Sequence, residues 1–246
     1  MDPDLLCRGS GRGLVEAWGP VRGESWRSAL TRVSRAPVLH TGEEQPAPPQ
    51  QARSLERQRK LLRAGRLLFA EKGYEATSIQ QIAARSGAAA GAFYTYFPSK
   101  RQLLVVLMNE LLQRLASLNL LPNRGGNDVR TGLRKFLASV FRADREYYGV
   151  LRAWQEAALS DAELGAMQRT IEVWTHARVL GVFQLLQRHP KARRDCDLPA
   201  FARMMDRHFW SLLARGSQMQ PRDFDHEVEL AADVIYHYLF HDARQG

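Results

Sequence analysis

Apolar residues recur at helical spacing through most of this 246-residue chain. The first clear instance is Leu61, Ala64, Leu68 and Phe69, which follow the i, i+3, i+7, i+8 spacing of one buried helix face. Gly73 comes just after the last periodic residue, where a glycine ends a helix because it adopts a left-handed conformation without a Cβ penalty. The pattern predicts a helix that ends at this glycine.

Two short helices are predicted next, separated by a glycine. Ser78-Ile79-Gln80-Gln81 is a capping box, in which the serine hydroxyl accepts from a backbone N–H and Gln81 bonds back to the serine N–H. This helix runs to about Ser86, Gly87 breaks it, and residues 88–94 supply a very short third helix of mostly small residues. Helix, glycine turn and short helix is the layout of a helix-turn-helix, which favours a DNA binder.

The segments FAEKGY, ATSIQQIAARSG and GAFYTYFPSK stand in this order and resemble the TetR (tetracycline repressor-like) family of transcriptional regulators from about Arg57 to Leu104. The resemblance implies that residues 88–94 form the recognition helix and that the partner is double-stranded DNA with a palindromic operator. Arg53 and Arg57 are expected to act as a basic arm that reaches the minor groove. The other candidate DNA-binding residues are Ser78, Gln80, Ala89, Ala90, Gly91, Tyr94, Thr95, Tyr96 and Lys100.

Several of these positions carry specific expectations. Tyr94 and Lys100 stand where the family contacts phosphate, Lys100 beside the start of the next helix. Gly65 replaces the usual alanine at a cost of about 1 kcal/mol in helix stability. Ala89 lacks the usual capping hydroxyl, a loss of about 1 kcal/mol, and Tyr96 replaces the usual histidine. Because the recognition helix is nearly all alanine and glycine, we expect sparse base readout and a larger role for DNA shape.

Positive charge concentrates in the same segment. The chain carries a formal net charge of +9, and nine Lys/Arg against three Asp/Glu lie between Arg53 and Lys100, whereas residues 1–52 hold six of each sign. A basic patch binds phosphate by releasing counterions, so DNA affinity is expected to fall steeply with salt. The alternative is that these residues form only the solvated face of an amphipathic helix.

Residues 1–52 read differently from the rest. They combine a Gly/Arg stretch with a proline-rich segment and show no sustained apolar period, so we expect a disordered extension, either a tail or an over-extended reading frame, or a partner site around Trp18 and Trp26. The start MDPDLL lacks a secretory signal and no apolar run reaches the ~20 residues of a membrane span, so we expect a cytoplasmic protein. Cys7 and Cys196 are expected to be free thiols.

The remaining chain shows helical spacing and no strand period, which predicts an all-α fold. We expect residues 53–100 to form a three-helix DNA-binding domain and residues 101–246 a larger helical domain for effector binding and dimerisation. The predicted helices beyond the DNA-binding domain lie near 99–118, 128–143, 145–159, 161–188, 198–215 and 224–241.

The last two helices carry apolar residues in a three-four alternation, which suits pairing with a second copy. In the resembled family such a hairpin forms the homodimer interface. The sequence leaves an ordinary intramolecular core equally open. The predicted interface residues are Met205, Phe209, Leu212, Val228, Ile235 and Leu239.

An effector pocket is expected in the larger domain, where aromatic residues line up on one helix and Arg178 interrupts the apolar stripe of the next. Arg178 either pairs with an internal carboxylate or receives an anionic effector. Stripes of this kind also occur in packed cores, so that alternative stays open. The candidate effector-binding residues are Tyr147, Trp154, Gln155, Trp174 and Arg178.

The function expected from the resemblance is a repressor released from its operator by a small molecule. An architectural DNA binder that needs no effector is the first alternative. A helical metal enzyme is the second, with His237 and His241 four residues apart and Asp233 and Asp242 nearby. The chain lacks a further ligand motif, a phosphate-binding glycine loop and a nucleophile elbow, so we expect no cofactor, no metal and no enzymatic activity.

Overall fold

The computed structural model describes residues 35–43, 46, 51–118, 128–143 and 145–240. These residues form helices and connecting loops, with an isolated bridge between Ala192 and Phe240 as their β-type pairing. The predicted all-α fold is therefore confirmed. The helices are α3 (Ala52–Lys72), α4 (Ile79–Ser86), α5 (Ala90–Tyr94), α6 (Lys100–Ser117), α7 (Val129–Ala143), the 3-10 turn η2 (Arg145–Tyr147), α8 (Tyr148–Ser160), α9 (Ala162–Leu186), α10 (Leu198–Arg215) and α11 (Pro221–Leu239).

Helix ends coincide with the local signals in the sequence. The capping box at Ser78 forms, and Gly73 and Gly87 adopt positive φ values of 83° and 75°. Ser99 caps α6 and Asp161 caps α9 through their side-chain oxygens. Beyond the DNA-binding domain, the predicted helices agree with the observed ones to within about three residues at each end.

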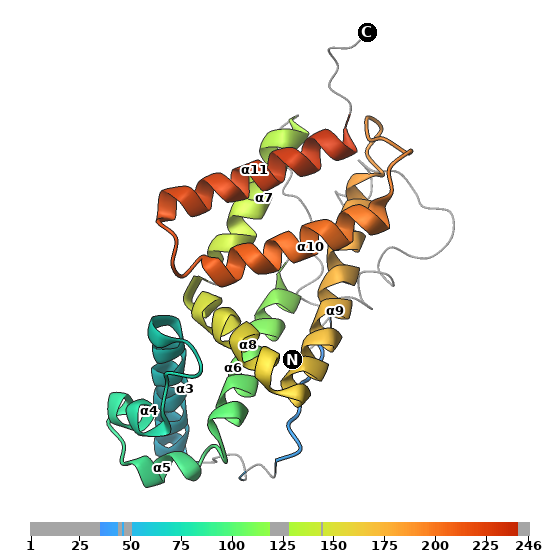
Figure 1. Ribbon diagram of the computed structural model, residues 1–246. Helices are drawn as coiled ribbons and strands as arrows, with labels where there is room; N and C mark the ends of the chain where they lie inside the picture. The colour runs from blue at the N-terminus through green and yellow to red at the C-terminus, as the bar shows by residue number, and fades with distance from the viewer. Residues whose placement is uncertain (1–34, 44–45, 47–50, 119–127, 144, 241–246) are drawn as a thin grey trace.

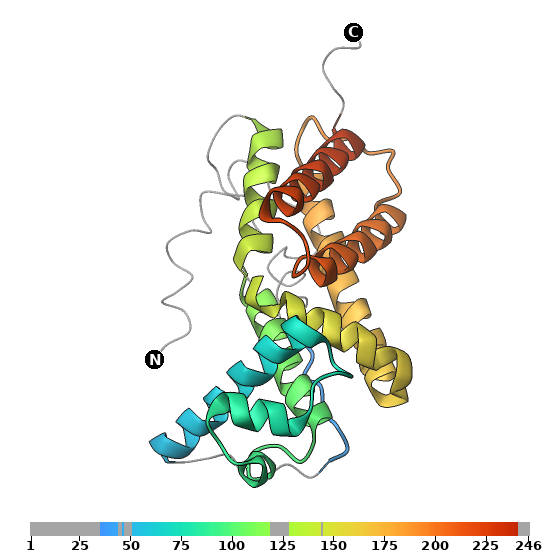
Figure 2. The same ribbon diagram turned by 60° about the vertical axis from the view of Figure 1, so that its left-hand side comes forward.

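The molecule is elongated, with the helix-turn-helix unit at one end and α7, α10 and α11 at the other (Figure 1). Helix α3 packs on α4, α6 and α8, whereas α10 packs on α8 and α9, and α11 packs on α7. Helices α6 and α8 therefore join the two ends, which Figure 2 shows from a second direction.

Small residues allow α3 to approach these two connecting helices. A Cβ added at Gly65 of α3 would lie 2.6 Å from Leu103 Cδ2 of α6, and one added at Gly149 of α8 would overlap the backbone of Ala70 in α3. The glycine that is expected to weaken α3 thus makes room for a buried leucine of α6. Close packing of this kind fixes the DNA-binding unit on the larger domain.

An extended segment ahead of α3, residues 36–43, lies along α6 and α9, and we call it the strap (blue in Figure 1). Leu39 is buried, its N–H donates to Asn109 Oδ1 at 2.8 Å, and Asn109 Nδ2 donates back to its carbonyl at 2.9 Å. Disorder, expected for all of residues 1–52, is therefore the wrong description of the strap. Trp18, Trp26 and the rest of residues 1–34 lie outside the described residues.

The carboxyl end of the strap is held by charge. Glu43 accepts a hydrogen bond from the Ser99 hydroxyl at 2.7 Å and pairs with Arg101 at 2.7 Å. Arg101 also pairs with Glu163 of α9, whose other carboxylate oxygen accepts from the Gly42 N–H. The strap therefore ties the first turn of α6 to the first turn of α9.

No helix in the described ranges has the length and apolar character that a membrane span requires. The Cys196 thiol is free and half-buried, 3.3 Å from the Tyr238 carbonyl, and burial raises its pKa. Cys7 lies outside the described residues.

Candidate DNA-binding surface and effector cavity

The helix predicted to recognise DNA is shorter than expected. Helix α5 begins at Ala90, because Ala89 is extended and offers no capping side chain. Phe93 is fully buried and packs against Phe97 at a ring-centroid distance of 5.6 Å, so both belong to the core. Tyr94, in contrast, is 54% exposed. The predicted contacts Ala89, Ala90, Gly91 and Thr95 are exposed as well, so they share with Tyr94 access to an approaching surface.

Tyr96 faces the protein more than the solvent. It is half-buried, and its hydroxyl lies 3.1 Å from the hydroxyl of Ser54 at the start of α3. The side chain therefore fastens the segment after α5 to α3. A DNA contact by Tyr96 stays a prediction, and it would need this hydroxyl to serve a second partner.

Lys100 has internal partners that differ from the expected phosphate contact. Its Nζ donates to the carbonyls of Tyr74 at 2.8 Å and Thr77 at 2.9 Å, and it lies 4.1 Å from the centre of the Tyr74 ring. Burial lowers the pKa of Lys100 and raises the pKa of Tyr74 to about 12. Because an ammonium has three N–H groups, one remains for a phosphate while two anchor α6 to the α3–α4 turn.

The start of α3 corrects another expectation. Arg53 and Arg57 belong to the first turns of a continuous helix that begins at Ala52, so within the described residues they do not form an extended arm. Both are exposed, as are Arg59, Lys60 and Arg63. The basic charge of this helix therefore suits phosphate contacts at its surface better than insertion into a minor groove.

At the N-terminal end of α4, the capping box uses only some of the hydrogen-bonding groups of Ser78. The Ser78 hydroxyl accepts from the Gln81 N–H at 3.2 Å, so its own hydrogen stays available for an acceptor such as phosphate. Gln80 in the same turn is exposed. Both residues stay candidate DNA contacts.

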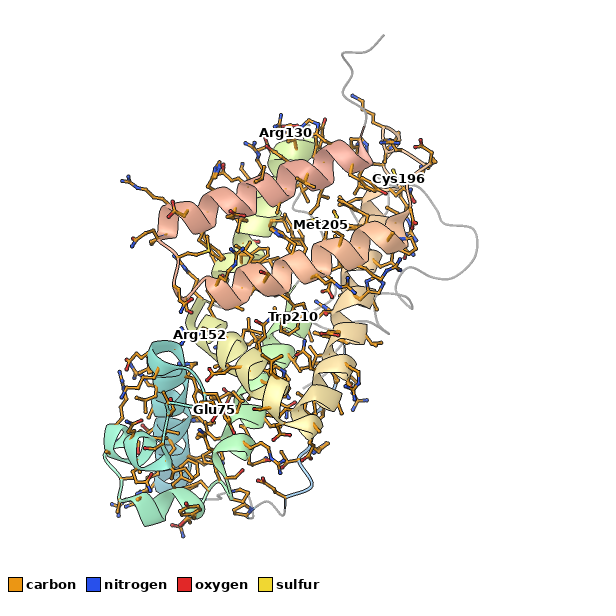
Figure 3. All side chains as sticks on the ribbon, viewed as in Figure 1. Glu75, Arg130, Arg152, Cys196, Met205 and Trp210 are labelled. Carbon is orange, nitrogen blue, oxygen red and sulfur yellow. The ribbon has the colours of Figure 1, made fainter. Side chains whose placement is uncertain are left out.

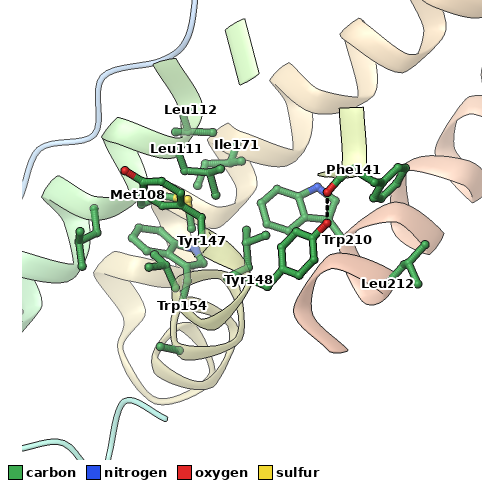
Figure 4. Close-up of a cluster of buried hydrophobic side chains, with 14 of the residues drawn as sticks. Met108, Leu111, Leu112, Phe141, Tyr147, Tyr148, Trp154, Ile171, Trp210 and Leu212 are labelled. Carbon is green, nitrogen blue, oxygen red and sulfur yellow. Dashed lines mark hydrogen bonds between the residues drawn. The ribbon is translucent and has the colours of Figure 1, made fainter. Parts of the chain in front are cut away.

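The larger domain contains a partly open cavity of about 140 Å³ between α6, α7, α8, α9, α10 and α11. Its walls are aliphatic and aromatic, and Figure 4 shows part of them, with Leu111, Phe141, Tyr148 and Trp210 around the same space. The Tyr148 hydroxyl donates to the Phe141 carbonyl. A concave, mostly apolar space with few polar groups is the usual form of a small-molecule site.

Only part of the predicted effector set lines this cavity. Trp174 and Arg178 do, whereas Tyr147, Trp154 and Gln155 are not among its lining residues. The Trp154 indole N–H donates to Gln168 at 2.7 Å, and the Tyr147 hydroxyl donates to Glu110 at 3.0 Å. Helix α8 instead turns the neighbouring positions 148 and 151 toward this cavity, and effector binding by the three residues stays a prediction.

Two buried groups of opposite charge lie in the cavity wall. Arg178 donates to the carbonyl of Leu115 at 2.7 Å, near the end of α6, and its guanidinium lies 4.9 Å from the centre of the Trp174 ring. Burial lowers the pKa of Arg178 to about 10. Asp206 accepts from the Thr175 hydroxyl at 3.2 Å, and burial raises the pKa of Asp206 to about 6.

Asp206 was missed from sequence because it lies beside Met205 in the stripe assigned to the dimer interface. A signal was present, since a carboxylate within an apolar stripe is rarely buried without a reason. Its hydroxyl partner Thr175 also accepts from the Trp210 indole N–H at 3.1 Å. The three residues form a short polar chain across α9 and α10.

Helix α8 reaches from the cavity to the DNA-binding unit. Tyr148 and Leu151 line the cavity, and two turns later Glu156 accepts from the N–H groups of Tyr74 and Glu75 at 2.9 Å each. Figure 3 shows Glu75 and the α8 residue Arg152 at this junction. One helix thus carries both a cavity wall and a carboxylate that holds the α3–α4 turn.

The residues predicted to form the dimer interface lie inside the protomer. Met205, Leu212, Val228, Ile235 and Leu239 are buried, so a second copy has no access to them. Phe209 is half-buried and packs on Phe141 with ring centroids 5.3 Å apart. The apolar alternation of both helices therefore packs in the intramolecular core, which is the alternative that the sequence left open.

A different face of the same helices exposes apolar side chains. Met204 is 53% exposed, Leu230 51% and Val234 41%, and the three residues line one shallow groove with Phe201 and Tyr238. Adjacent exposed apolar residues of this kind mark a surface that suits association.

The residues proposed for a metal enzyme have other partners or lie outside the described chain. Arg130 and Arg134 both bond to Asp233 and hold its pKa well below the usual range. His241 and Asp242 lie outside the described residues. Among the residues that the structure describes, no cluster of metal-ligating side chains is present.

A family model for bacterial regulatory proteins of the tetR family matches residues 61–107. The uncharacterized HTH-type transcriptional regulator YuxN of Bacillus subtilis (strain 168) is 36% identical over 86 residues, 35% of this chain and 30% of that protein. The HTH-type transcriptional repressor KstR of Rhodococcus jostii (strain RHA1) is 33% identical over 88 residues, 36% of this chain and 41% of that protein. The chain thus spans less than half the length of these curated relatives.

The solved SmeT–triclosan complex resembles the present fold with a TM-score of 0.59 and 20% sequence identity, covering 76% of this chain and 93% of that one. SmeT is the repressor of the Stenotrophomonas maltophilia multidrug efflux pump SmeDEF. This likeness extends the shared fold through the larger helical domain. Residues 61–107, which contain the helix-turn-helix, thus resemble the tetR family of bacterial regulatory proteins.

Proposed function

We propose that this protein is a DNA-binding transcriptional repressor whose operator binding is released by a small-molecule effector. The observation that carries the proposal is the presence, in one chain, of an exposed helix-turn-helix surface and an apolar cavity joined by α6 and α8. The relative KstR is named a repressor, and the fold neighbour SmeT is solved with triclosan. Because the proposed partner is chromosomal DNA, the proposal also places the protein in the cytoplasm.

Release follows from how α6 is held at its two ends. Lys100 fastens its first turn to the α3–α4 turn, and Arg178 bonds the Leu115 carbonyl near its last turn from the cavity wall. A ligand that moves Arg178 or the α8 residues Tyr148 and Leu151 changes the support of the DNA-binding unit. The ligand then favours an arrangement with lower operator affinity, in proportion to its differential affinity for the two arrangements.

We further propose that the working form is a homodimer that pairs through Met204, Leu230 and Val234. Two-fold pairing through this face presents two recognition helices to one palindromic operator, whose half-sites lie about one helical turn apart, roughly 34–36 Å. The exposed apolar side chains of the groove support this face over the buried stripe.

The test is selection of bound sites from random duplex DNA, followed by anisotropy titration of the enriched sequence across a salt series. A palindrome with half-sites one turn apart and a steep salt slope is the expected result. Salt-dependent binding without any enriched sequence would instead mean an architectural role. No binding at low salt would overturn the proposal.

A matched pair of variants locates the DNA surface. Tyr94→Ala removes an exposed side chain of α5 and is expected to weaken operator binding about ten-fold, whereas Leu159→Ala, 91% exposed at the C-terminal end of α8, is expected to leave it unchanged. Equal affinities for the two variants would place the DNA contact elsewhere.

A further inference from the structure

The carboxylate of Asp206 is the least satisfied charged group in the cavity wall. Asp206 is only 6% exposed, and among the described residues its carboxylate accepts a hydrogen bond from the Thr175 hydroxyl at 3.2 Å. Thr175 also accepts from Trp210, so this hydroxyl is already shared. Buried carboxylates are normally paired with a cation, because removing a charge from water costs far more than one neutral hydrogen bond returns.

Arg178 does not act as that cation. It lines the same cavity, yet in the described part of the chain it lies beyond salt-bridge distance of Asp206, and it bonds the Leu115 carbonyl and stacks over Trp174. Its positive charge is therefore directed at the end of α6, where a helix concentrates partial negative charge. The carboxylate is left facing an apolar space.

The remaining walls suit a cation with an apolar body. The rings of Phe136, Phe141, Trp174 and Phe209 surround the space, and aromatic faces attract cations as well as bury apolar surface. The volume of about 140 Å³ is close to that of the roughly 150 Å³ apolar cavities that accommodate a single benzene ring. A ligand of about one ring with a short chain matches this volume.

We propose that the effector of this cavity is a small hydrophobic amine, protonated at neutral pH, whose ammonium group pairs with Asp206 while its apolar body fills the aromatic walls. This assignment rests on the proposed ligand-released function, which it deepens by naming the ligand class. Thr175 acts as a positioning residue, because its hydroxyl holds one carboxylate oxygen and leaves the other for the ammonium.

The experiment compares three probes of similar size with the full chain: 2-phenylethylamine, the neutral 2-phenylethanol and the anionic 3-phenylpropanoate. Calorimetry measures binding, and anisotropy with the selected operator measures release of DNA. The amine is expected to bind at least about ten-fold more tightly than the alcohol and more tightly still than the acid, since only the amine supplies the missing charge.

Variants assign the preference to one residue. Asp206→Asn is expected to remove the discrimination between amine and alcohol, whereas Asp223→Asn, an exposed change on α11, is expected to retain it. A purely structural Asp206 would alter stability without changing which probe is preferred. If Asp206→Asn fails to fold, the comparison of the three probes on the unchanged protein still decides.

The outcomes separate this inference from the proposed function. Preferred binding of the amine without loss of DNA affinity would support the ligand class and overturn ligand-released repression. Preferred binding of the acid or the alcohol would overturn the ligand class, and release of DNA by that probe would still support the repressor. Failure of all three probes to bind would also overturn the ligand class.

Discussion

At the scale of single residues, Gly149 shows how little room separates the DNA-binding unit from the larger domain. A methyl group at this position would overlap the backbone of Ala70, so α3 and α8 would have to move apart. Gly149→Ala is expected to destabilise the protein by about 2 kcal/mol, within the range for overpacked cores. Urea denaturation measures the change.

The control for this substitution is Gly181→Ala in α9, where an added Cβ meets nothing within 4 Å. That change is expected to stabilise the protein by roughly 0.5–1 kcal/mol through helix propensity alone. If both substitutions shifted stability in the same direction, close packing of α8 on α3 would not explain the glycine.

Asp206 gives a stability prediction that depends on pH. Burial raises the pKa of Asp206 to about 6, so the folded protein holds a proton that the unfolded chain releases nearer pH 4. Its contribution to stability is therefore present below pH 4 and is lost as the pH rises to about 6. Glu172 adds to the rise in this pKa and Arg207 opposes it.

The wild-type protein is accordingly expected to lose about 2 kcal/mol relative to Asp206→Asn between pH 4.5 and 8, measured by urea denaturation. Other titrating groups cancel in this difference, because they are common to both proteins. Asp223→Asn, exposed on α11, serves as a control whose difference from wild type should stay constant across the same range. A constant difference for Asp206→Asn too would contradict an elevated pKa.

The structural role of a residue could be predicted from the sequence where that role depends only on neighbouring residues in the chain. The Ser78 capping box and the glycine at 87 act within one turn of chain, and both appear as expected. The packing role of Gly65 and the burial of Asp206 were not predicted, because they depend on Leu103 and Thr175, which approach from other helices. The spacing of apolar residues along one helix does not show which side chains of other helices will contact it.

At the scale of elements, the strap carries the clearest prediction. Leu39→Ala removes a buried side chain from the contact with α6 and is expected to cost about 2 kcal/mol, the low end for a buried leucine. The adjacent Val38→Ala changes a side chain that is 55% exposed and is expected to shift stability by less than about 0.5 kcal/mol. Equal effects in thermal or urea unfolding would mean that the strap is not packed in solution.

Helices and the strap differ in what makes them predictable. Periodic apolar residues and caps define each helix from its own sequence, and this is why α10 begins and ends where expected. The strap has no period, since its order comes from a side-chain amide, a serine and an arginine on another element. Composition therefore indicated disorder for residues that tertiary contacts hold in place.

At the scale of the whole molecule, the proposed dimer leads to a prediction on mass. Leu230→Glu places a charge in the exposed apolar groove of α10 and α11 and is expected to turn a dimer into a monomer at about 5 µM. Light scattering after gel filtration measures the mass. Operator affinity should fall with it, because one recognition helix alone loses the second half-site.

Leu159→Glu introduces the same charge at a side chain that is 91% exposed on α8 and should leave the mass unchanged. A dimer that persists in Leu230→Glu would mean that another face pairs the protomers. Dissociation of both variants would indicate a general effect of added charge.

The rotation of helices about their axes was the least predictable property at this scale. In α8 and α10 apolar residues cover more than one face, so sequence alone did not say which face meets the cavity, the core or solvent. Trp154 and Met205 consequently changed from expected binding residues to core residues. Trp174 and Arg178 kept their expected place, because a charge within an apolar stripe marks one face of α9.

The strap also bears on how much effector the protein needs. It bonds α6 at Asn109 and at Arg101, neither of which lines the cavity or belongs to the recognition helix. Any rotation of α6 in the proposed release would strain or break these hydrogen bonds, so the strap favours the arrangement that binds DNA. A substitution at position 109 is therefore expected to change the effector concentration that gives half-maximal release of DNA. Neither the preferred operator sequence nor the preferred ligand should change, because the strap lies outside both sites.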